Sequence, residues 1–413
     1  MISVRVGNSE LPLEDVLENP GRHARLLERA KTTQGFAECG CTAGRLRPKL
    51  VIRRHREIFL LARWPEQAQL HGDSCPFQRR NTGKGGTGSE QDPFRFRNGA
   101  RDIRLDASLK ISSRTPTKPV KSHPEGESKK PQRRTAGLLA FLEFAWEQAG
   151  LNLWTGSGGR GWSACWSQLS AELADCRINN RPADQALHIV ERWDPSRKAE
   201  ILAEQDAWLA RLTPAATGSL RGLLIAEVAA HEPSQFGAKF VLRQTQLRCF
   251  MSSALYERLQ RSYGPALAGA GQPNQRCVAM LLVEKPADRN YLTLVDGAAM
   301  LTNAQFLPCD STYEVAMADH LVALRRAFRK PLRHIGNAPV HPDFVLTDTT
   351  AEVIVEVLGL TGNPEYDARM ASKREHYRAA GVSMIEWDAP TQALDSVQLP
   401  QRAAKRSEVA HEG

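Results

Sequence analysis

The chain has 413 residues, a hydrophobic content of 41% and a net charge of +9 at pH 7. This length exceeds that of one small domain, so we expect two or three domains with sizeable buried cores. No apolar run approaches the roughly 18 residues of a membrane span, and the start of the chain lacks a secretory signal, so we expect a cytoplasmic protein that does not act in a membrane.

Residues 1–78 have the features of a small metal-binding module. Helical periodicity covers residues 11–30, and the run LRPKLVIRRHREIFLLARW predicts two strands with a turn near His55. The pairs Cys39-x-Cys41 and His71-x-x-x-Cys75 flank these strands. Three thiolates and one imidazole are typical of a closed, structural Zn²⁺ site. We therefore predict a zinc-ribbon-like module; the alternative is a set of unrelated buried thiols and a surface histidine.

Residues 79–135 have the composition of a basic, flexible linker. Fifteen Lys or Arg and six Asp or Glu lie within residues 76–135, which accounts for the whole net charge of the chain. Glycine, serine and proline are frequent here, as in disordered segments, although Phe94, Phe96 and Ile103 could anchor a short strand. Such a basic segment can follow a phosphate backbone, but charge alone also fits a solvated linker.

The middle of the chain changes from helical to strand-like patterns. Residues 136–215 predict a helical domain with helices near 136–150, 163–176 and 195–212. Its closely spaced tryptophans are more typical of a helical core than of base stacking. Residues 216–308 contain four strand-like runs and a helix near 253–263, which indicates an α+β segment.

Residues 309–395 predict the order helix, strand, strand, helix, strand. The first helix starts at the capping box of Ser311 and Glu314 and continues to about residue 328. Strands follow at 342–347 and 352–358, then a helix that begins with Asn363 as its cap, and a strand at 382–387. We expect residues 396–413 to form a disordered tail.

Two acidic residues in these strands are candidates for a site. Asp343 starts the first strand, and Glu356 lies within the apolar run VIVEVLGL, where a buried carboxylate is costly unless something binds it. Carboxylates of this kind can hold a divalent cation that activates water, and Lys373 on the next helix can stabilise developing negative charge. The alternative is that Asp343 caps a turn and Glu356 is a half-exposed strand residue.

The residues Pro342-Asp343 and Glu356 within this order of elements resemble the core of the PD-(D/E)XK nuclease superfamily. The resemblance covers about the last hundred residues and implies a restriction-endonuclease-like α/β domain. It implies that Asp343 and Glu356 bind Mg²⁺ or Mn²⁺, with help from the carbonyl of Val357. The superfamily lysine usually follows the glutamate by two residues, where this chain has Leu358, but some members supply it from the following helix. The resemblance gives the remaining roles to Lys373 as the catalytic lysine, Glu314 as an additional acid, and Arg369, Tyr366 and Tyr377 as nucleic-acid contacts.

The whole chain also resembles an uncharacterised bacterial family of integrating and conjugative mobile elements. The matching features are the Cys-x-Cys and His-x-x-x-Cys pairs, the block LLAFLEFAWEQAGLNLW and the C-terminal PDF…E…G. We therefore expect an α+β multidomain nuclease that acts on nucleic acid, in the first place DNA, with mobile-element proteins as partners. One alternative is an inactive DNA-binding accessory protein on the same scaffold. Another is a zinc-nucleated protein-interaction factor that never touches DNA.

Overall fold

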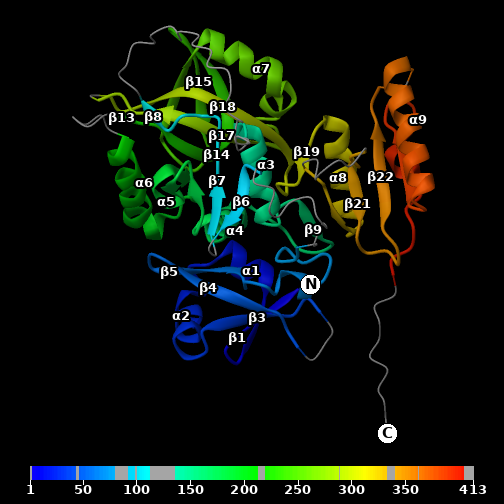
Figure 1. The fold of residues 1–413 in the computed structure, drawn as a ribbon, viewed down its shortest axis with the longest axis horizontal. Coiled ribbons are helices and arrows are strands. Elements are labelled where there is room, and N and C mark those ends of the chain that lie inside the picture. Colours follow the sequence, from blue (N-terminus) through cyan, green and yellow to red (C-terminus); the bar gives the residue numbers. More distant parts are fainter. Residues whose placement is uncertain are drawn as a thin grey trace, which may run out of the picture.

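The protein is a mixed α+β molecule with an N-terminal module, a central β-barrel with helices packed against it, and a C-terminal sheet (Figure 1). The computed structural model describes residues 2–42, 46–79, 92–97, 100–111, 135–212, 219–287, 289–332, 340–360 and 362–403. Within these ranges no helix has both the length and the apolar character needed to cross a membrane.

The N-terminal module is a five-stranded sheet with its own apolar core. The strands are β1 (Ser3–Val6), β2 (Ser9–Pro12), β3 (Phe36–Cys39), β4 (Lys49–His55) and β5 (Ile58–Arg63), in the order β2-β1-β3-β4-β5. The expected helical stretch is divided into α1 (Leu13–Glu18) and α2 (Ala24–Thr33), because Pro20 between them cannot continue a helix. Val4, Leu27 and Leu50 are fully buried. The module is therefore larger than a zinc ribbon, which relies on metal in place of such a core.

Part of the predicted linker is packed against the central region. It forms β6 (Phe94–Arg97), β7 (Ala100–Ile103) and β8 (Lys110–Ile111), and β7 pairs in parallel with β10 (Arg177–Ile178). The Phe94 ring stacks on that of Phe144 at 4.2 Å between centroids, and Ile103 is fully buried. A flexible linker was thus the wrong expectation for residues 92–97 and 100–111, because Phe94 and Ile103 pack into the core of the central region. Residues 80–91 and 112–134 lie outside the described residues.

The three helices that the sequence predicts in the central region are present, and a short fourth helix was not expected. They are α3 (Leu138–Gln148), α4 (Trp162–Leu173), α5 (Ala183–Ala186) and α6 (Lys198–Leu212), with the 3₁₀ turn η2 (Pro195–Arg197) before α6. Short strands lie between them: β9 (Leu153–Thr155), β11 (Arg181–Pro182) and β12 (Leu187–Ile189). In this region Trp146, Trp154, Trp162, Trp166 and Trp208 are buried, whereas Trp193 is 38% exposed. The burial confirms the expected core position for all of the clustered tryptophans except Trp193.

Five strands close into a barrel. They are β14 (Gly222–Ser234), β15 (Gly237–Leu242), β16 (Arg248–Ser252), β17 (Gln275–Glu284) and β18 (Leu292–Asn303), paired in the cycle β14-β15-β16-β18-β17-β14. The pair β16–β18 is parallel and the other four pairs are antiparallel. Helix α7 (Ser253–Ala268) connects β16 to β17. Two further strands, β12 and β19 (Pro308–Cys309), extend the barrel sheet, while β13 (Ser219–Leu220) pairs with β8 in a separate two-stranded sheet.

The C-terminal elements form a second sheet beside the barrel, with α8 (Thr312–Ala323) between the two (Figure 1). The strands are β20 (Ala327–Arg329), β21 (Phe344–Leu346), β22 (Val353–Leu358) and β23 (Ser383–Asp388), in the order β23-β22-β21-β20-β9. Helix α9 (Pro364–Ala379) connects the parallel pair β22 and β23. The first helix was expected to continue to about residue 328, but β20 occupies the end of that range. Helix α8 ends early because the backbone turns at Arg325, which has a φ of 54°.

One face of the C-terminal sheet belongs to the core of the barrel, while Val345, Ile354 and Tyr377 form a small separate cluster on the other face. Phe328 and Val355 belong to the same buried cluster as Leu224 and Phe240 of the barrel, and β9 of the helical region pairs with β20. Buried residues from both sides of the expected boundaries near residues 216 and 309 share this cluster, such as Leu212 with Leu224 and Leu301 with Val315.

The chain after the last sheet strand remains attached to the C-terminal sheet. The turn η3 (Leu394–Ser396) follows β23, the backbone N–H of Ala403 donates to the carbonyl of Asp348 at 2.8 Å, and Arg326 donates to the carbonyl of Pro400 at 3.0 Å. Disorder was thus the wrong expectation for residues 396–403, because backbone hydrogen bonds hold them; residues 404–413 lie outside the described part.

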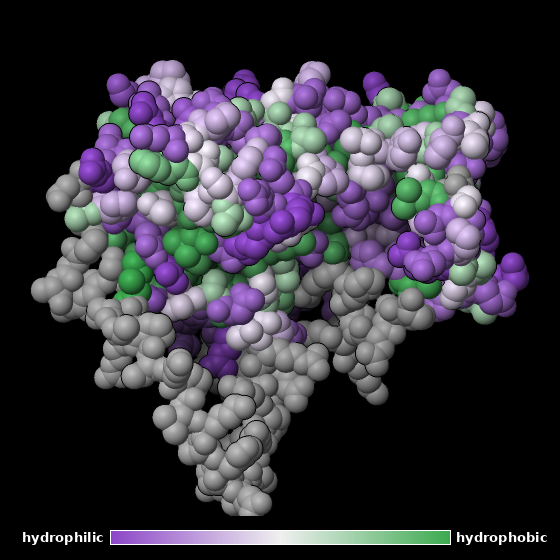
Figure 2. Space-filling model, turned by 90° about the horizontal axis from the view of Figure 1, so that it is seen from above, coloured by the Kyte–Doolittle hydropathy of each residue, from purple (hydrophilic) through white to green (hydrophobic). Residues whose placement is uncertain are grey.

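On the face seen from above in Figure 1, hydrophilic residues predominate, with small hydrophobic groups between them (Figure 2).

Candidate functional site

The two predicted carboxylates, Asp343 and Glu356, lie directly opposite each other on neighbouring strands. Phe344 of β21 pairs with Val355 of β22 in an antiparallel ladder, which places the preceding Asp343 opposite Glu356. The Asp343 carboxylate accepts a hydrogen bond from the Val357 N–H at 2.8 Å. Burial and the nearby Asp343 charge raise the pKa of Glu356 to about 7. The two acids therefore converge at one edge of the sheet and repel each other when both are ionised.

Helix α9 adds two polar side chains to this pair. Asn363 caps the helix by accepting hydrogen bonds from the backbone N–H groups of Glu365 and Tyr366. One helical turn apart, Lys373 and Tyr377 both reach Glu356: the ammonium lies 2.8 Å from Oε2 and the phenol 3.2 Å from Oε1. Since only 1% of Glu356 is exposed, these contacts supply the hydrogen bonds that a buried carboxylate requires.

Lys373 also anchors the chain that precedes Asp343. Its ammonium donates to the His341 carbonyl at 2.7 Å, while the His341 ring contacts the carbonyl of Pro331 at 2.8 Å. The lysine thus joins α9 to the segment from which Asp343 projects, and it lies within direct contact of one carboxylate of the pair.

A second acid–lysine group lies beside the first, at the start of α8. Ser311 caps this helix and accepts the backbone N–H of Glu314 at 3.1 Å, as the capping box predicts. The Glu314 carboxylate receives the Lys330 ammonium at 2.6 Å, and Lys330 also donates to Asp310 at 2.8 Å. Burial raises the pKa of Glu314 to about 7, with Lys330 opposing and Asp343 adding to the rise. The Asp343 charge therefore acts on Glu314, but the ion-pair partner of Glu314 is Lys330, whereas that of Glu356 is Lys373.

Lys330 is the residue that sequence reasoning missed. It follows β20 and is only 1% exposed. Burial by itself would lower the pKa of its ammonium, but Glu314 and Asp310 raise it above the ordinary value, so the side chain stays charged. The sequence signal was weak, because Lys330-Pro331 has the pattern of an ordinary turn.

The residues expected to contact nucleic acid have different surroundings. Arg369 is exposed on α9, with its guanidinium 5.6 Å from the centre of the Tyr366 ring. The Tyr366 hydroxyl accepts the N–H of Gly359 at 3.3 Å and lies 3.4 Å from the Val357 carbonyl. Tyr377 is only 6% exposed, so its hydroxyl faces Glu356 and not an outer surface. A nucleic-acid contact by Tyr377 does not fit this burial.

The four expected zinc ligands come together at the edge of the N-terminal sheet. Their ligand atoms all lie within 4.8 Å of one another. The Sγ atoms of Cys39 and Cys75 are 3.7 Å apart, and Nδ1 of His71 lies 3.3 Å from Sγ of Cys41 and 3.4 Å from Sγ of Cys75. A tetrahedral zinc ion with metal–ligand distances of about 2.0 to 2.3 Å requires similar spacings. The cluster can therefore hold a metal ion such as zinc.

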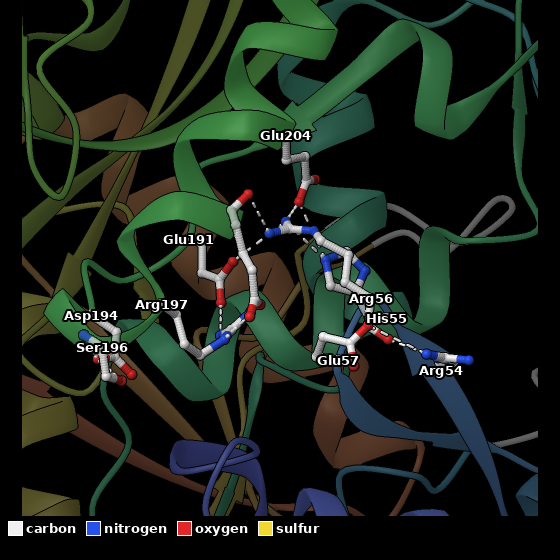
Figure 3. Close-up of polar contacts among 10 residues, drawn as sticks. Arg54, His55, Arg56, Glu57, Glu191, Asp194, Ser196, Arg197 and Glu204 are labelled. Carbon is white, nitrogen blue, oxygen red and sulfur yellow. Dashed lines mark hydrogen bonds and ion pairs between the residues drawn. The ribbon is translucent and has the colours of Figure 1, made fainter.

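A further group of ligand types, His55, Glu191 and Glu204, is occupied by arginine side chains (Figure 3). Arg56, at the turn between β4 and β5, pairs with Glu191 and Glu204, and Arg197 pairs with Glu191. Burial lowers the pKa of His55 to about 4, with a further contribution from Arg56. Because the cations are already supplied, this group joins the N-terminal module to the central helices and needs no metal ion.

Comparison with known proteins identifies one family. Residues 15–389 match the family model described as "Protein of unknown function (DUF1173)", so the chain belongs to this family. No curated protein and no solved structure matches the chain.

Proposed function

We propose that this member of the DUF1173 family is a metal-dependent nuclease that hydrolyses phosphodiester bonds of nucleic acid, in the first place DNA. The observation that carries the proposal is the convergence of Asp343 and Glu356 on adjacent strands, with the Lys373 ammonium 2.8 Å from Glu356. A buried carboxylate with a raised pKa, beside a second acid and a cation, is a frequent property of catalytic sites.

The donor set of the acid pair fits a small divalent cation. Two carboxylates and the neighbouring Val357 carbonyl are oxygen ligands, which Mg²⁺ and Mn²⁺ prefer. Repulsion between the two acids, which contributes to the raised pKa of Glu356, would be relieved by such an ion. When bound, the ion would lower the pKa of a coordinated water and neutralise charge on the phosphate.

The remaining side chains have separate roles in this proposal. Lys373 would stabilise negative charge that develops on the phosphate, and Tyr377 would hold Glu356 in its orientation. Lys330 would keep Glu314 ionised beside Asp343, so that the third acid adds negative potential near the ion. The exposed Arg369 would contact a flanking phosphate of the substrate.

The N-terminal cluster would have a structural task. Cys39, Cys41, Cys75 and Nδ1 of His71 would hold zinc with all four positions filled, which leaves no position for a substrate. The resemblance to proteins of integrating and conjugative elements suggests that the nuclease acts in the handling of mobile-element DNA, together with other proteins of such elements.

One observation favours an inactive DNA-binding protein as the second candidate. Lys373 contacts Oε2 of Glu356 directly and also the carbonyl of His341. An ammonium in this position neutralises the carboxylate and competes with a metal ion for the same oxygen. In that case the scaffold would bind DNA without cleaving it.

Cleavage assays distinguish these candidates. Purified protein is incubated with linear duplex and single-stranded DNA and with Mg²⁺ or Mn²⁺, beside Asp343→Asn, Glu356→Gln and Lys373→Met. We expect cleavage by the wild type and losses of about a hundredfold or more in the first two variants, the scale of several kcal/mol in the barrier. Glu352→Gln removes a partly exposed carboxylate just before the same strand and should remain active. Equal cleavage by all five proteins would refute the proposed site, and no cleavage by any would favour the second candidate.

A further inference from the structure

The barrel has the connectivity of a Greek-key barrel of the OB type. Numbered within the barrel, its strands 1 to 5 are β14, β15, β16, β17 and β18, and the pairing cycle is 1-2-3-5-4-1 with strands 3 and 5 parallel. The helix α7 lies between strands 3 and 4, and its Leu255 and Leu259 join the buried residues of the barrel interior. Barrels of this topology bind oligonucleotides or oligosaccharides on the outer face of strands 2 and 3, between the loops that connect strands 1–2 and 4–5.

Among the described residues, helices and short strands cover the side of this barrel formed by β14 and β17. The outward residues of β14 and β17, among them Ile225 and Met280, are buried in one cluster with side chains of α3 and α4. The outward residues of β15 and β16 follow the opposite pattern: Lys239, Val241 and Phe250 are half-buried and Arg248 is exposed. Strands 2 and 3 therefore keep an accessible outer face, while strands 1 and 4 use theirs for packing.

A groove of about 540 Å³ lies on this accessible face. Its size is within the range of ligand-binding pockets. Residues from strand 3 and from both loops line it, including Phe236 from the loop between strands 1 and 2, Arg248 and Phe250 from strand 3, and Asn290 and Tyr291 from the loop between strands 4 and 5.

Aromatic rings are the main apolar groups of the groove. The rings of Phe250 and Tyr291 meet edge to face at 5.2 Å between centroids, and Phe236 is 80% exposed. The turn that carries Phe236 lies tightly against β16, since a Cβ atom on Gly237 would approach the Met251 carbonyl oxygen to 2.2 Å. The exposed ring is thus held beside the groove by a backbone contact that only glycine permits. Exposed, fixed rings of this kind provide stacking surfaces for unpaired bases.

Positive charge accompanies the rings. Arg248 lines the groove, and Lys285 and Arg289 lie in the loop between strands 4 and 5. Within the described residues no ion pair with a carboxylate is formed by Arg248 or Arg289. Lys239, opposite Phe250 in the ladder, pairs with Glu232 at 2.9 Å. Cations without partners favour a polyanion over an uncharged oligosaccharide.

We propose that the outer face of β15 and β16 binds single-stranded DNA, with bases stacked on Phe236, Phe250 and Tyr291 and phosphates beside Arg248. The choice of DNA over RNA rests on the proposed function, whereas the binding face is argued from the barrel alone. The barrel shares its core with the C-terminal sheet. A DNA strand bound on this face therefore lies on a unit that is packed together with the sheet of the acid pair.

Fluorescence anisotropy of the full chain with a labelled single-stranded DNA of mixed sequence tests this proposal. No divalent metal is added, so that binding is measured without cleavage. We expect Phe236→Ala and Tyr291→Ala each to weaken binding by about 5- to 100-fold, because stacking on one ring contributes about 1 to 3 kcal/mol. Arg248→Gln should weaken binding and reduce its salt dependence by about 0.7 in the logarithmic slope. Phe96→Ala is the matched control, since Phe96 is 63% exposed and lies on β6 outside the groove.

The outcomes separate this proposal from the nuclease proposal. Wild-type affinity in both ring variants would overturn the binding face, and so would equal losses in Phe96→Ala. Tighter binding of duplex DNA, of RNA of the same sequence or of an uncharged oligosaccharide would overturn the assigned ligand. Unchanged binding by Asp343→Asn would support a binding face separate from the acid pair. Binding that depends on the groove residues in a protein that never cleaves DNA would support the face while the nuclease proposal fails.

Discussion

Replacing Glu356 by glutamine should stabilise the protein at alkaline pH while it removes the proposed metal site. The folded protein raises the pKa of Glu356 from 4.5 to about 7, first through burial and then through the Asp343 charge. Between these two pH values the folded state binds a proton that the unfolded state releases, so stability falls as the pH rises through this window. Above about pH 7 the ionised carboxylate therefore lowers the stability of the fold, and glutamine carries no such charge.

The expected gain follows from the same pKa. A change from 4.5 to about 7 corresponds to about 3 kcal/mol between the protonated and ionised forms. Glutamine can keep the hydrogen bond to Tyr377 but loses the ion pair with Lys373, which offsets part of the gain. We expect Glu356→Gln to be more stable than the wild type by about 1 to 2 kcal/mol at pH 8 and nearly equal to it at pH 4.5.

Thermal unfolding in buffer without added divalent metal measures this difference. Each kcal/mol should raise Tm by about 2 to 4 °C. Glu352→Gln, which changes a carboxylate with 41% side-chain exposure, should alter stability by less than about 0.5 kcal/mol at either pH. A Glu356→Gln protein that is destabilised equally at pH 8 and pH 4.5 would refute the argument, because the effect would then not depend on the protonation of Glu356.

Three further predictions concern other parts of the molecule. Lys330→Met should destabilise the fold by about 3 to 5 kcal/mol, because it leaves the buried Glu314 without its cation. In chemical denaturation, the double variant Lys330→Met/Glu314→Leu should recover part of this stability. An equal loss of stability in the single and the double variant would contradict the ion-pair argument. Burial lowers the pKa of His188 to about 4, so that on acidification the unfolded state takes up a proton before the folded state does. Stability should therefore fall by up to about 3 kcal/mol from pH 6.5 to pH 4. The denaturation midpoint of His188→Gln should depend less on pH in this window, and a pH dependence equal to that of the wild type would count against the neutral, buried ring. Elemental analysis should find about one zinc per chain. Cys41→Ser should lose the metal and thermal stability, whereas the control Cys176→Ser should retain the metal. Wild-type protein without zinc would exclude the structural site.

Local features of the C-terminal region could be predicted from its residues. Ser311 and Asn363 cap their helices as their positions predict, since capping depends on neighbours within one turn. The alternation in β22 also places Glu356 on the face that α9 covers, opposite Val355 and Val357. These properties need only local chemistry and the two-residue period of a strand.

Contacts between distant segments could not be predicted in this way. The pairing of β9 with β20 joins residues 153–155 to residues 327–329, and Lys330 became part of the site through Asp310 and Glu314. No local pattern identifies such partners. The sequence of a three-residue strand, or of a lysine before a proline, does not differ between an exposed turn and a buried core.

The residues themselves determined which groups are available: the Cys and His pairs, the acids within apolar strands, and the helices with their caps. Only the tertiary structure decided that Tyr377 faces Glu356, that residues 92–97 and 100–111 belong to a core, and that five strands close into a barrel with one accessible face. The physical reason is that helix caps and strand alternation arise from neighbours along the chain, whereas burial and closure arise from packing between segments far apart in sequence.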